Sequence, residues 1–134
     1  MTKFEEFKQI KILVVDDDEM DLIQAKCLLE RIIQFKIILT SSVIDAMGIL
    51  REEKINLVVA NTDMSLANGF RMIELMRDDI NLRNIPIFLA TTSKYPAAML
   101  EIEQSGANGG IQKPFDSLAN FEPIIKFLIP SIEV

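Results

Sequence analysis

The segment ILVVDDDE, residues 12–19, joins a short apolar run to a cluster of carboxylates. Its apolar part is rich in β-branched residues and lacks in-out alternation, which is typical of a strand buried on both faces of a parallel sheet. Three further runs share these properties, and a fifth, weaker run is predicted as a strand from its place in the sequence. The five predicted strands are 11–15, 36–40, 56–60, 85–91 and 109–112.

Five other segments, one after each strand, have the apolar spacing of helices. Ser41 and Ser42 offer an N-cap for the second of them, and Gly106 offers a C-cap for the fourth. Pro123 lies inside the last segment, so we expect its regular helix to begin near Glu122, with the proline in the first turn. The predicted helices are 19–34, 43–53, 69–79, 96–105 and 118–129.

Strand and helix therefore alternate five times along the 134 residues. This alternation predicts an α/β fold, a doubly wound (βα)5 three-layer sandwich with helices on both faces of a parallel five-stranded sheet. We expect the flavodoxin-like strand order 2-1-3-4-5. A single domain is expected over 1–134, with its core at about 10–128, a short N-terminal lead and a C-terminal tail.

The composition argues against several classes of function. A formal net charge of −6 without a basic cluster disfavours binding to nucleic acid or to an anionic membrane. The absence of histidine excludes Ser-His and Cys-His catalytic pairs, a phosphohistidine and imidazole metal sites. Cys27 is the only cysteine, so no internal disulfide is expected. Without a long apolar run or a signal-peptide pattern, the chain is expected in the cytoplasm.

Polar residues that follow the predicted strands point to a site. Asp16 and Asp17 follow the first strand, Asn61 follows the third, Thr91 ends the fourth and Lys113 follows the fifth. The expected strand order brings these ends together at the carboxyl edge of the sheet, where ligands bind. Clustered carboxylates favour Mg²⁺, while a hydroxyl and an ammonium would hold phosphoryl oxygens, and the ammonium would pair with a carboxylate in an empty site. Each residue alone has an ordinary structural explanation, so only their conjunction indicates function.

From about residue 10 to 128 the chain resembles the receiver domains of two-component response regulators, of the chemotaxis-receiver type. The acidic pair after the first strand, the loop after the third strand, the fourth strand and the Lys-Pro pair occur in the family's order and spacing. The residues that carry this resemblance are Ile12–Asp18, Leu57–Met64 with Gly69 eight residues after Asn61, Ile85–Ile87 leading to Thr91, Gly106–Gly109, and Lys113–Phe115.

The resemblance implies a role for each site residue. Asp16 and Asp17 would organise Mg²⁺, with Asp17 the more direct ligand and the backbone carbonyl of Asp63 a further one. Thr91 would move toward a phosphoryl group, and Lys113 would contact it. The bond between Lys113 and its following proline would be cis, as is common in this motif.

Three positions depart from the family pattern. Asn61 stands where the family has the aspartate that accepts the phosphoryl group, Ser65 replaces the usual proline, and Gly110 replaces the aromatic switch residue. A carboxamide oxygen is a poor nucleophile, so Asn61 should not be phosphorylated. The loss of one negative charge should also weaken Mg²⁺ binding, so no cofactor is expected to be required. The resemblance therefore implies a non-enzymatic pseudo-receiver that signals without aspartyl phosphorylation.

Such a receiver would act by binding a histidine kinase, a phosphorelay protein or an output protein. By resemblance, the face made by the fourth helix, the fifth strand and the fifth helix docks this partner or a second copy. Ile124 and Phe127 lie off the main apolar stripe of the last helix, which fits either partial exposure for a partner or packing against neighbouring segments. Phe4 and Phe7 could dock a short N-terminal helix, or the terminus could be frayed.

Two alternatives keep phosphate chemistry. One is a receiver phosphorylated at an unusual acceptor such as Asp63. The other is a small phosphohydrolase, because Asp16 and Asp18 resemble the DxD nucleophile motif of the haloacid dehalogenase group. That group usually has Thr or Val where this chain has Met20, and it needs further acidic residues and a longer chain.

Overall fold

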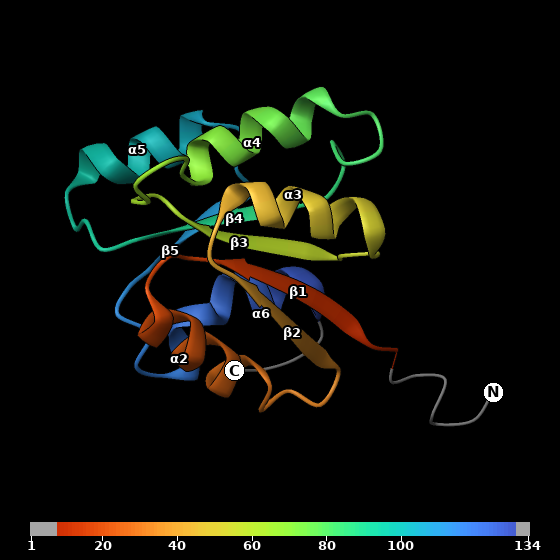
Figure 1. Ribbon diagram of the computed structural model, residues 1–134. Helices are drawn as coiled ribbons and strands as arrows, with labels where there is room; N and C mark the ends of the chain where they lie inside the picture. Colours follow the sequence, from red (N-terminus) through yellow and green to blue (C-terminus); the bar gives the residue numbers. More distant parts are fainter. Residues whose placement is uncertain (1–7, 131–134) are drawn as a thin grey trace.

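Five short apolar segments form one parallel sheet, and the computed structural model describes residues 8–130 around it (Figure 1). Neighbouring strands follow the order β2-β1-β3-β4-β5, which confirms the predicted order. The apolar residues of β3 and β4 are buried because helices cover both faces of the sheet. The strands are β1 (Ile10–Val15), β2 (Phe35–Thr40), β3 (Leu57–Asn61), β4 (Ile87–Thr91) and β5 (Gly109–Gln112).

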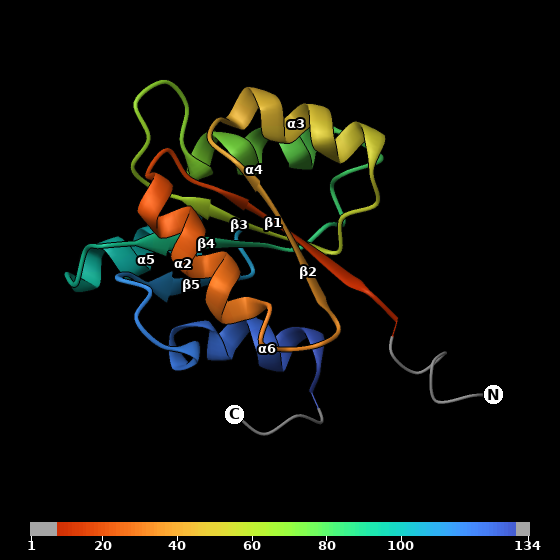
Figure 2. The same cartoon turned by 60° about the horizontal axis from the view of Figure 1, so that its bottom comes forward.

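The helices form two layers, one on each side of the sheet. Figure 1 shows α3, α4 and α5 on one face and α2 with α6 on the other, and Figure 2 turns the second pair forward. Each layer packs its own apolar cluster against the strands, so the predicted three-layer sandwich is confirmed. The helices are α2 (Glu19–Leu29), α3 (Val43–Glu52), α4 (Gly69–Asp78), α5 (Pro96–Gln104), the 3₁₀ turn η1 (Leu118–Phe121) and α6 (Glu122–Leu128).

The helix ends agree with the capping signals of the sequence. Ser42 caps α3, with its side chain accepting a hydrogen bond from the backbone N–H of Asp45 at 3.1 Å. Gly106 follows α5 with a φ of 92°, a left-handed conformation that favours glycine. Pro123 lies in the first turn of α6, as predicted. These local signals are reliable because they satisfy backbone groups that the helix itself leaves unpaired.

The predicted helix 19–34 is too long, because α2 ends at Leu29. The backbone N–H of Arg31 and that of Ile32 donate to the carbonyls of Leu28 and Leu29 at 3.2 and 3.1 Å, and the chain turns there. Ile32 still packs into the core on the α2 side of the sheet, so its apolar spacing survives outside a helix. The turn is needed because β2 begins at Phe35, directly beside β1.

The two apolar side chains singled out on α6 behave differently. Ile124 is fully buried, so of the two alternatives left open for it the packing one holds. Phe127 is 47% exposed, and its ring meets that of Phe88 edge to face at a centroid distance of 5.5 Å. Phe4 and Phe7 lie outside the described residues, so the proposal for an N-terminal helix stays a prediction.

Gly69 allows α4 to begin close to the sheet. A Cβ atom at this position would lie 2.6 Å from Leu89 Cδ2 and 2.9 Å from the backbone oxygen of Asn61. We therefore expect Gly69→Ala to lower the free energy of unfolding by about 1–3 kcal/mol, because the helix must move away from the strand. Urea denaturation measures this difference.

The matched control is Gly48→Ala inside α3, where a Cβ atom meets no other atom within 4 Å. There the substitution should stabilise the protein by about 0.5–1 kcal/mol, since alanine favours helix more than glycine does. Equal effects of the two substitutions would contradict the close approach at Gly69.

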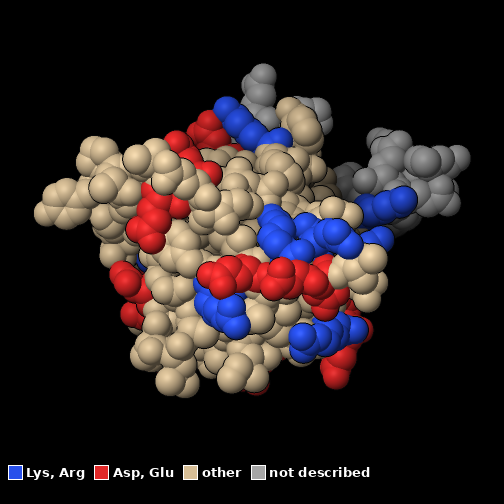
Figure 3. Space-filling model, turned by 90° about the horizontal axis from the view of Figure 1, so that it is seen from above, with Lys and Arg blue, Asp and Glu red and all other residues tan. Residues whose placement is uncertain are grey.

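The face covered by α3, α4 and α5 carries both signs of charge (Figure 3). Acidic side chains lie between basic ones on this face, for example where Arg71 Nη1 contacts Glu74 Oε2 at 2.8 Å. The drawn face therefore presents no broad basic area that would attract a phosphate backbone. Within residues 8–130, no helix is long and apolar enough to cross a membrane.

Candidate functional site

Besides Thr40 at the end of β2, four polar residues are buried at the carboxyl edge of the sheet. Asp16 follows β1, Asn61 and Thr91 end β3 and β4, and Lys113 follows β5. Their exposed fractions are 2%, 6%, 3% and 3%, respectively. Because all the strands are parallel, Asp16, Asn61 and Lys113 lie at the same edge of the sheet. Burial of polar and charged groups requires partners, so the contacts between them determine what the site can do.

Lys113 is held between two carboxylates. Its Nζ atom lies 2.5 Å from Asp16 Oδ2 and 2.7 Å from Asp21 Oδ2. The expected pairing of the ammonium with a first-strand carboxylate is therefore present. Burial alone would lower the pKa of Lys113, but the hydrogen bonds that it donates to Asp16 and Asp21 raise that pKa above its ordinary value. The side chain of Lys113 therefore stays protonated and positively charged in the crevice.

Asp16 accepts hydrogen bonds on both of its carboxylate oxygens. Oδ2 takes the ammonium of Lys113, while Oδ1 accepts from the backbone N–H of Asp18 at 3.0 Å and from Asn61 Nδ2 at 3.1 Å. Burial raises the pKa of Asp16 above its usual range, and the hydrogen bond from Lys113 works in the opposite direction. The carboxylate is thus surrounded by donors from three separate segments of the chain.

The carboxamide of Asn61 bridges two acceptors. Its Nδ2 atom donates to Asp16 Oδ1 at 3.1 Å and to the backbone carbonyl of Asp63 at 2.8 Å. Its Oδ1 atom accepts from the backbone N–H of Asp63 at 3.3 Å. The amide orientation follows from these partners, because only the NH2 group can donate to a carboxylate and a carbonyl. Among the described residues, no buried side-chain nitrogen or oxygen lacks a hydrogen-bond partner.

The remaining predicted site residues lie around this network. Asp17 is exposed, and Asp63 joins the network through its backbone while its side chain is exposed. Thr91 is buried, and its Oγ1 atom accepts from the backbone N–H of Ser93 at 3.0 Å. The Lys113–Pro114 bond is cis, as predicted. The structure therefore brings Asp16, Asn61 and Lys113 into direct contact and leaves Asp17 and Thr91 at the margin.

The position expected to carry an aromatic switch residue is packed by a helix. A Cβ atom on Gly110 would lie 3.2 Å from Met99 Cε and 3.3 Å from two carbons of Ile102, both on α5. These side chains lie against the bare backbone of β5. Because Gly110 has no side chain, α5 packs closely against β5 at this position. No aromatic ring is present there that could change position when Thr91 moves.

Asp21 is a member of the site that the sequence reasoning missed. It lies in the first turn of α2, and its side chain is 20% exposed. It binds the ammonium of a residue that is 92 positions away along the chain. A carboxylate five residues after Asp16 would face the same crevice if the helix began immediately, which is the signal that could have revealed it. The carboxylates of Asp16 and Asp17 with the ammonium of Lys113 sum to a formal charge of −1, and Asp21 makes the sum −2.

Most of the oxygen atoms that the resemblance assigns to Mg²⁺ are already engaged, and the exception is the exposed carboxylate of Asp17. Asp16 Oδ1 and the carbonyl of Asp63 both accept from Asn61 Nδ2, and the second oxygen of Asp16 holds Lys113. Within residues 8–130, no group of three or more acidic, cysteine or histidine side chains is arranged to hold a metal ion. As folded, this donor set does not fit a hard divalent cation.

The chain is similar to a known family of signalling domains. A family model described as the response regulator receiver domain matches residues 12–122. The polar-differentiation response regulator DivK of Brucella ovis is 25% identical over 117 residues, which cover 87% of this chain and 94% of that protein. The response regulator Rre1 of Synechocystis sp. is 24% identical over 120 residues, or 90% of this chain and 52% of that protein. The chain thus spans about half of the length of Rre1.

A solved structure shows the same fold. The chemotaxis response regulator CheY4 of Vibrio cholerae superimposes with a TM-score of 0.79 at 19% sequence identity. The match covers 91% of this chain and 100% of that one. The likeness agrees with the observed strand order and the helices on both faces of the sheet.

Proposed function

This chain belongs to the response regulator receiver family, and we propose that it is an atypical receiver that works through protein contacts without being phosphorylated. Family membership makes it a receiver domain of the two-component type. The proposal adds that its signal does not depend on an aspartyl phosphate and that it is not an enzyme. We propose the cytoplasm as its compartment, because a single exposed cysteine fits a reducing environment.

The observation that carries this proposal is the state of residue 61. The side chain at the end of β3 is a buried, neutral carboxamide whose nitrogen and oxygen are both hydrogen-bonded inside the protein. An acyl phosphate requires a carboxylate oxygen that attacks phosphorus, and this position offers none. The ammonium of Lys113 is likewise paired with the carboxylates of Asp16 and Asp21. These buried charges therefore have partners without a phosphoryl group.

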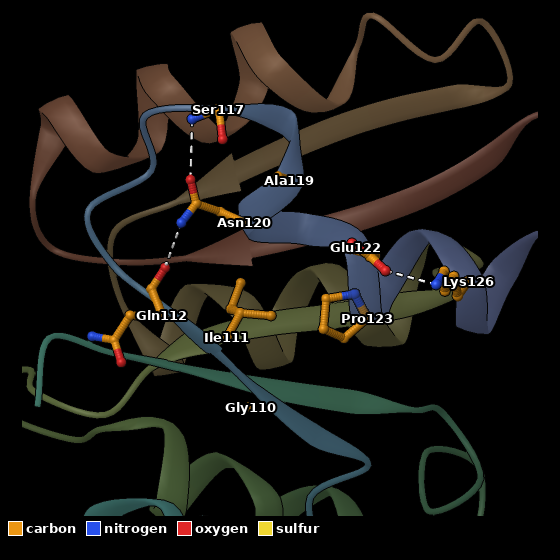
Figure 4. A pocket seen from close by; sticks show the side chains of 9 residues that line it. All are labelled: Gly110, Ile111, Gln112, Ser117, Ala119, Asn120, Glu122, Pro123 and Lys126. Atoms are coloured by element: carbon orange, nitrogen blue, oxygen red, sulfur yellow. Dashed lines mark hydrogen bonds and ion pairs between the residues drawn. The ribbon is translucent and has the colours of Figure 1, made fainter. Parts of the chain in front are cut away.

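Receiver domains interact with kinases and other proteins in signalling, and we propose the face made by α5, β5 and α6 as the docking surface here. A groove of about 600 Å³ runs along β5 beside η1 and α6 (Figure 4). Residues of β5, Gly110 to Gln112, line one side of it, while Asn120 and the Glu122–Lys126 ion pair line the other. The half-exposed ring of Phe127 on α6 adds apolar area to this face.

The partner would be a histidine kinase, a phosphorelay protein, an output protein or a second copy of the chain. Sedimentation velocity over a range of concentrations tests the last of these. A sedimentation coefficient that rises with concentration would support a homodimer, and a constant monomer value would leave a different protein as the partner.

The test of the proposed function is to incubate the wild-type protein with acetyl phosphate and Mg²⁺ and to measure its intact mass. We expect no phosphoryl adduct, because the only group at the acceptor position is an amide. A stoichiometric adduct on the folded protein would overturn the proposal. Peptide mapping of such an adduct to Asp63 would favour the second candidate, a receiver with an unusual acceptor, which the exposure of that side chain permits.

A small phosphohydrolase is the remaining alternative. Its DxD motif would need Asp18 as a chemical group, but this carboxylate caps α2 by accepting from the backbone N–H of Asp21 at 3.1 Å. Turnover of an aryl phosphate by the purified protein would revive this alternative. We expect none.

A further inference from the structure

We infer that the crevice excludes divalent cations because the chain's own amide and ammonium groups occupy the positions where a cation would bind. The amide belongs to Asn61 and the ammonium to Lys113. This inference rests on the proposed function, since it explains how a receiver can remain folded and complete with neither metal nor phosphate. Asp21 contributes by holding the ammonium of Lys113 in place.

The first step concerns the amide nitrogen of Asn61. It lies 3.1 Å from Asp16 Oδ1 and 2.8 Å from the carbonyl oxygen of Asp63. The resemblance assigns both oxygens to Mg²⁺, together with the exposed carboxylate of Asp17. An ion bound by both oxygens would have to lie between them at about 2.0–2.1 Å from each. The nitrogen already fills that space. A cation can bind these two oxygens together only if the amide leaves.

The second step concerns the other oxygen of Asp16. Lys113 Nζ lies 2.5 Å from Oδ2. The side chain of Lys113 is 3% exposed and that of Asp16 is 2% exposed. Asp21, from the first turn of α2, holds the same ammonium at 2.7 Å. The lysine is thereby anchored on the side of α2 and β1, and its positive charge faces any cation that approaches Asp16. Asp21 acts through Lys113 and not on a ligand.

The third step is the penalty for displacing the amide. If a cation moved Asn61 aside, its NH2 group would lose two buried acceptors, which would weaken binding by roughly ten- to hundredfold. This effect is separate from the missing charge at residue 61. A family aspartate would add a ligand, whereas the amide both omits that ligand and obstructs the site.

Two substitutions at the same residue separate obstruction from charge. Asn61→Ala removes the amide but keeps the charge of the crevice, and Asn61→Asp adds a carboxylate. The probe is Mg²⁺ alone, and the readout is the melting temperature measured against NaCl of equal ionic strength. A ligand that binds only the folded state stabilises it by RT ln(1 + L/Kd), where L is the free ligand concentration, and therefore raises the melting temperature.

We expect no Mg²⁺-dependent shift for the wild type, a measurable shift for Asn61→Ala and the largest shift for Asn61→Asp. The apparent Mg²⁺ affinity of the alanine variant should exceed that of the wild type at least tenfold. The control variant is Asp116→Asn, which removes an exposed carboxylate from the loop after β5 and should behave like the wild type. The control corrects for weak, diffuse attraction of Mg²⁺ to an acidic protein.

Two outcomes would overturn the inference. One is a wild-type shift as large as that of Asn61→Ala, and the other is an alanine variant that binds Mg²⁺ no better than the wild type, which would leave charge alone as the cause. If Asn61→Ala fails to fold, Mn²⁺ broadening of the wild-type backbone amides of residues 16–21 decides the question, and site-specific broadening at millimolar Mn²⁺ contradicts the inference.

Failure of the cation-exclusion inference can be distinguished from failure of the proposed function. A wild-type protein that binds Mg²⁺ but takes no phosphoryl group from acetyl phosphate refutes cation exclusion alone. A wild-type protein that becomes phosphorylated refutes the proposed function.

Discussion

Asn61→Asp is expected to convert an unreactive protein into one that takes up one phosphoryl group per chain from acetyl phosphate and Mg²⁺. The new carboxylate oxygen would attack phosphorus and release acetate, which the carboxamide cannot do. It would stand at the end of β3, next to Asp16 and near the ammonium of Lys113. Thr91 remains buried at the neighbouring strand end. The other groups that the resemblance assigns to phosphoryl binding are therefore already present.

Intact mass before and after incubation measures this change, and peptide mapping locates the adduct at residue 61. Asn81→Asp is the matched control, because it introduces the same carboxylate at an exposed position after α4 and should remain unlabelled. A folded Asn61→Asp protein that takes up no phosphoryl group would mean that Ser65 and Gly110 also prevent phosphorylation. The departure at residue 61 would then be one of several that abolish the reaction.

Lys113→Met is expected to lower the free energy of unfolding by about 3–5 kcal/mol, because it leaves buried carboxylates without their cation. Asp16 is 2% exposed, and both it and Asp21 would lose the ammonium that they share. The methionine side chain is close in length to lysine, so a void contributes little. The loss measures the uncompensated charge, and it should be large in a protein of this size.

Urea denaturation followed by circular dichroism provides this measurement. Lys126→Met is the matched control, since Lys126 pairs with Glu122 at 2.6 Å but is 57% exposed at its side chain. There we expect a change of less than about 1 kcal/mol. A similar, small loss from both substitutions would contradict the buried network of Lys113, Asp16 and Asp21.

Much of the fold was predictable because the first four strands are short and apolar through most of their length. Strand β5 spans Gly109–Gln112 as predicted, although its two glycines carry little strand signal, because its place in the alternation was informative. The predicted helix 19–34 was too long, since Ile32 has helical spacing yet packs from a turn. Apolar spacing reports which side chains are buried, and it does not report where the chain must reverse to enter the next strand.

The site was predictable only in part. The meeting of Asp16 and Asn61 follows from strand order, because the carboxyl ends of the neighbouring strands β1 and β3 share one edge. Lys113 follows β5 at the same edge of the sheet, and its long side chain reaches Asp16 from there. The role of Asp21 did not follow, since it depends on how far α2 brings that carboxylate toward a lysine on another strand. Likewise, the donation of Asn61 Nδ2 to Asp16 and to the carbonyl of Asp63 depends on side-chain angles that sequence spacing does not encode.

The order of amino acids thus specified the receiver architecture and the substitution at residue 61, because both depend on residue type and on spacing along the chain. Only the folded arrangement decided what that substitution does. The carboxylate of Asp16 accepts hydrogen bonds from Asn61 and Lys113, which lie 45 and 97 positions away from it along the chain. Their nitrogen atoms fill the space around that carboxylate. The physical reason is that occupancy of a buried crevice is a matter of distances between side chains from separate strands, which exist only once the sheet has formed.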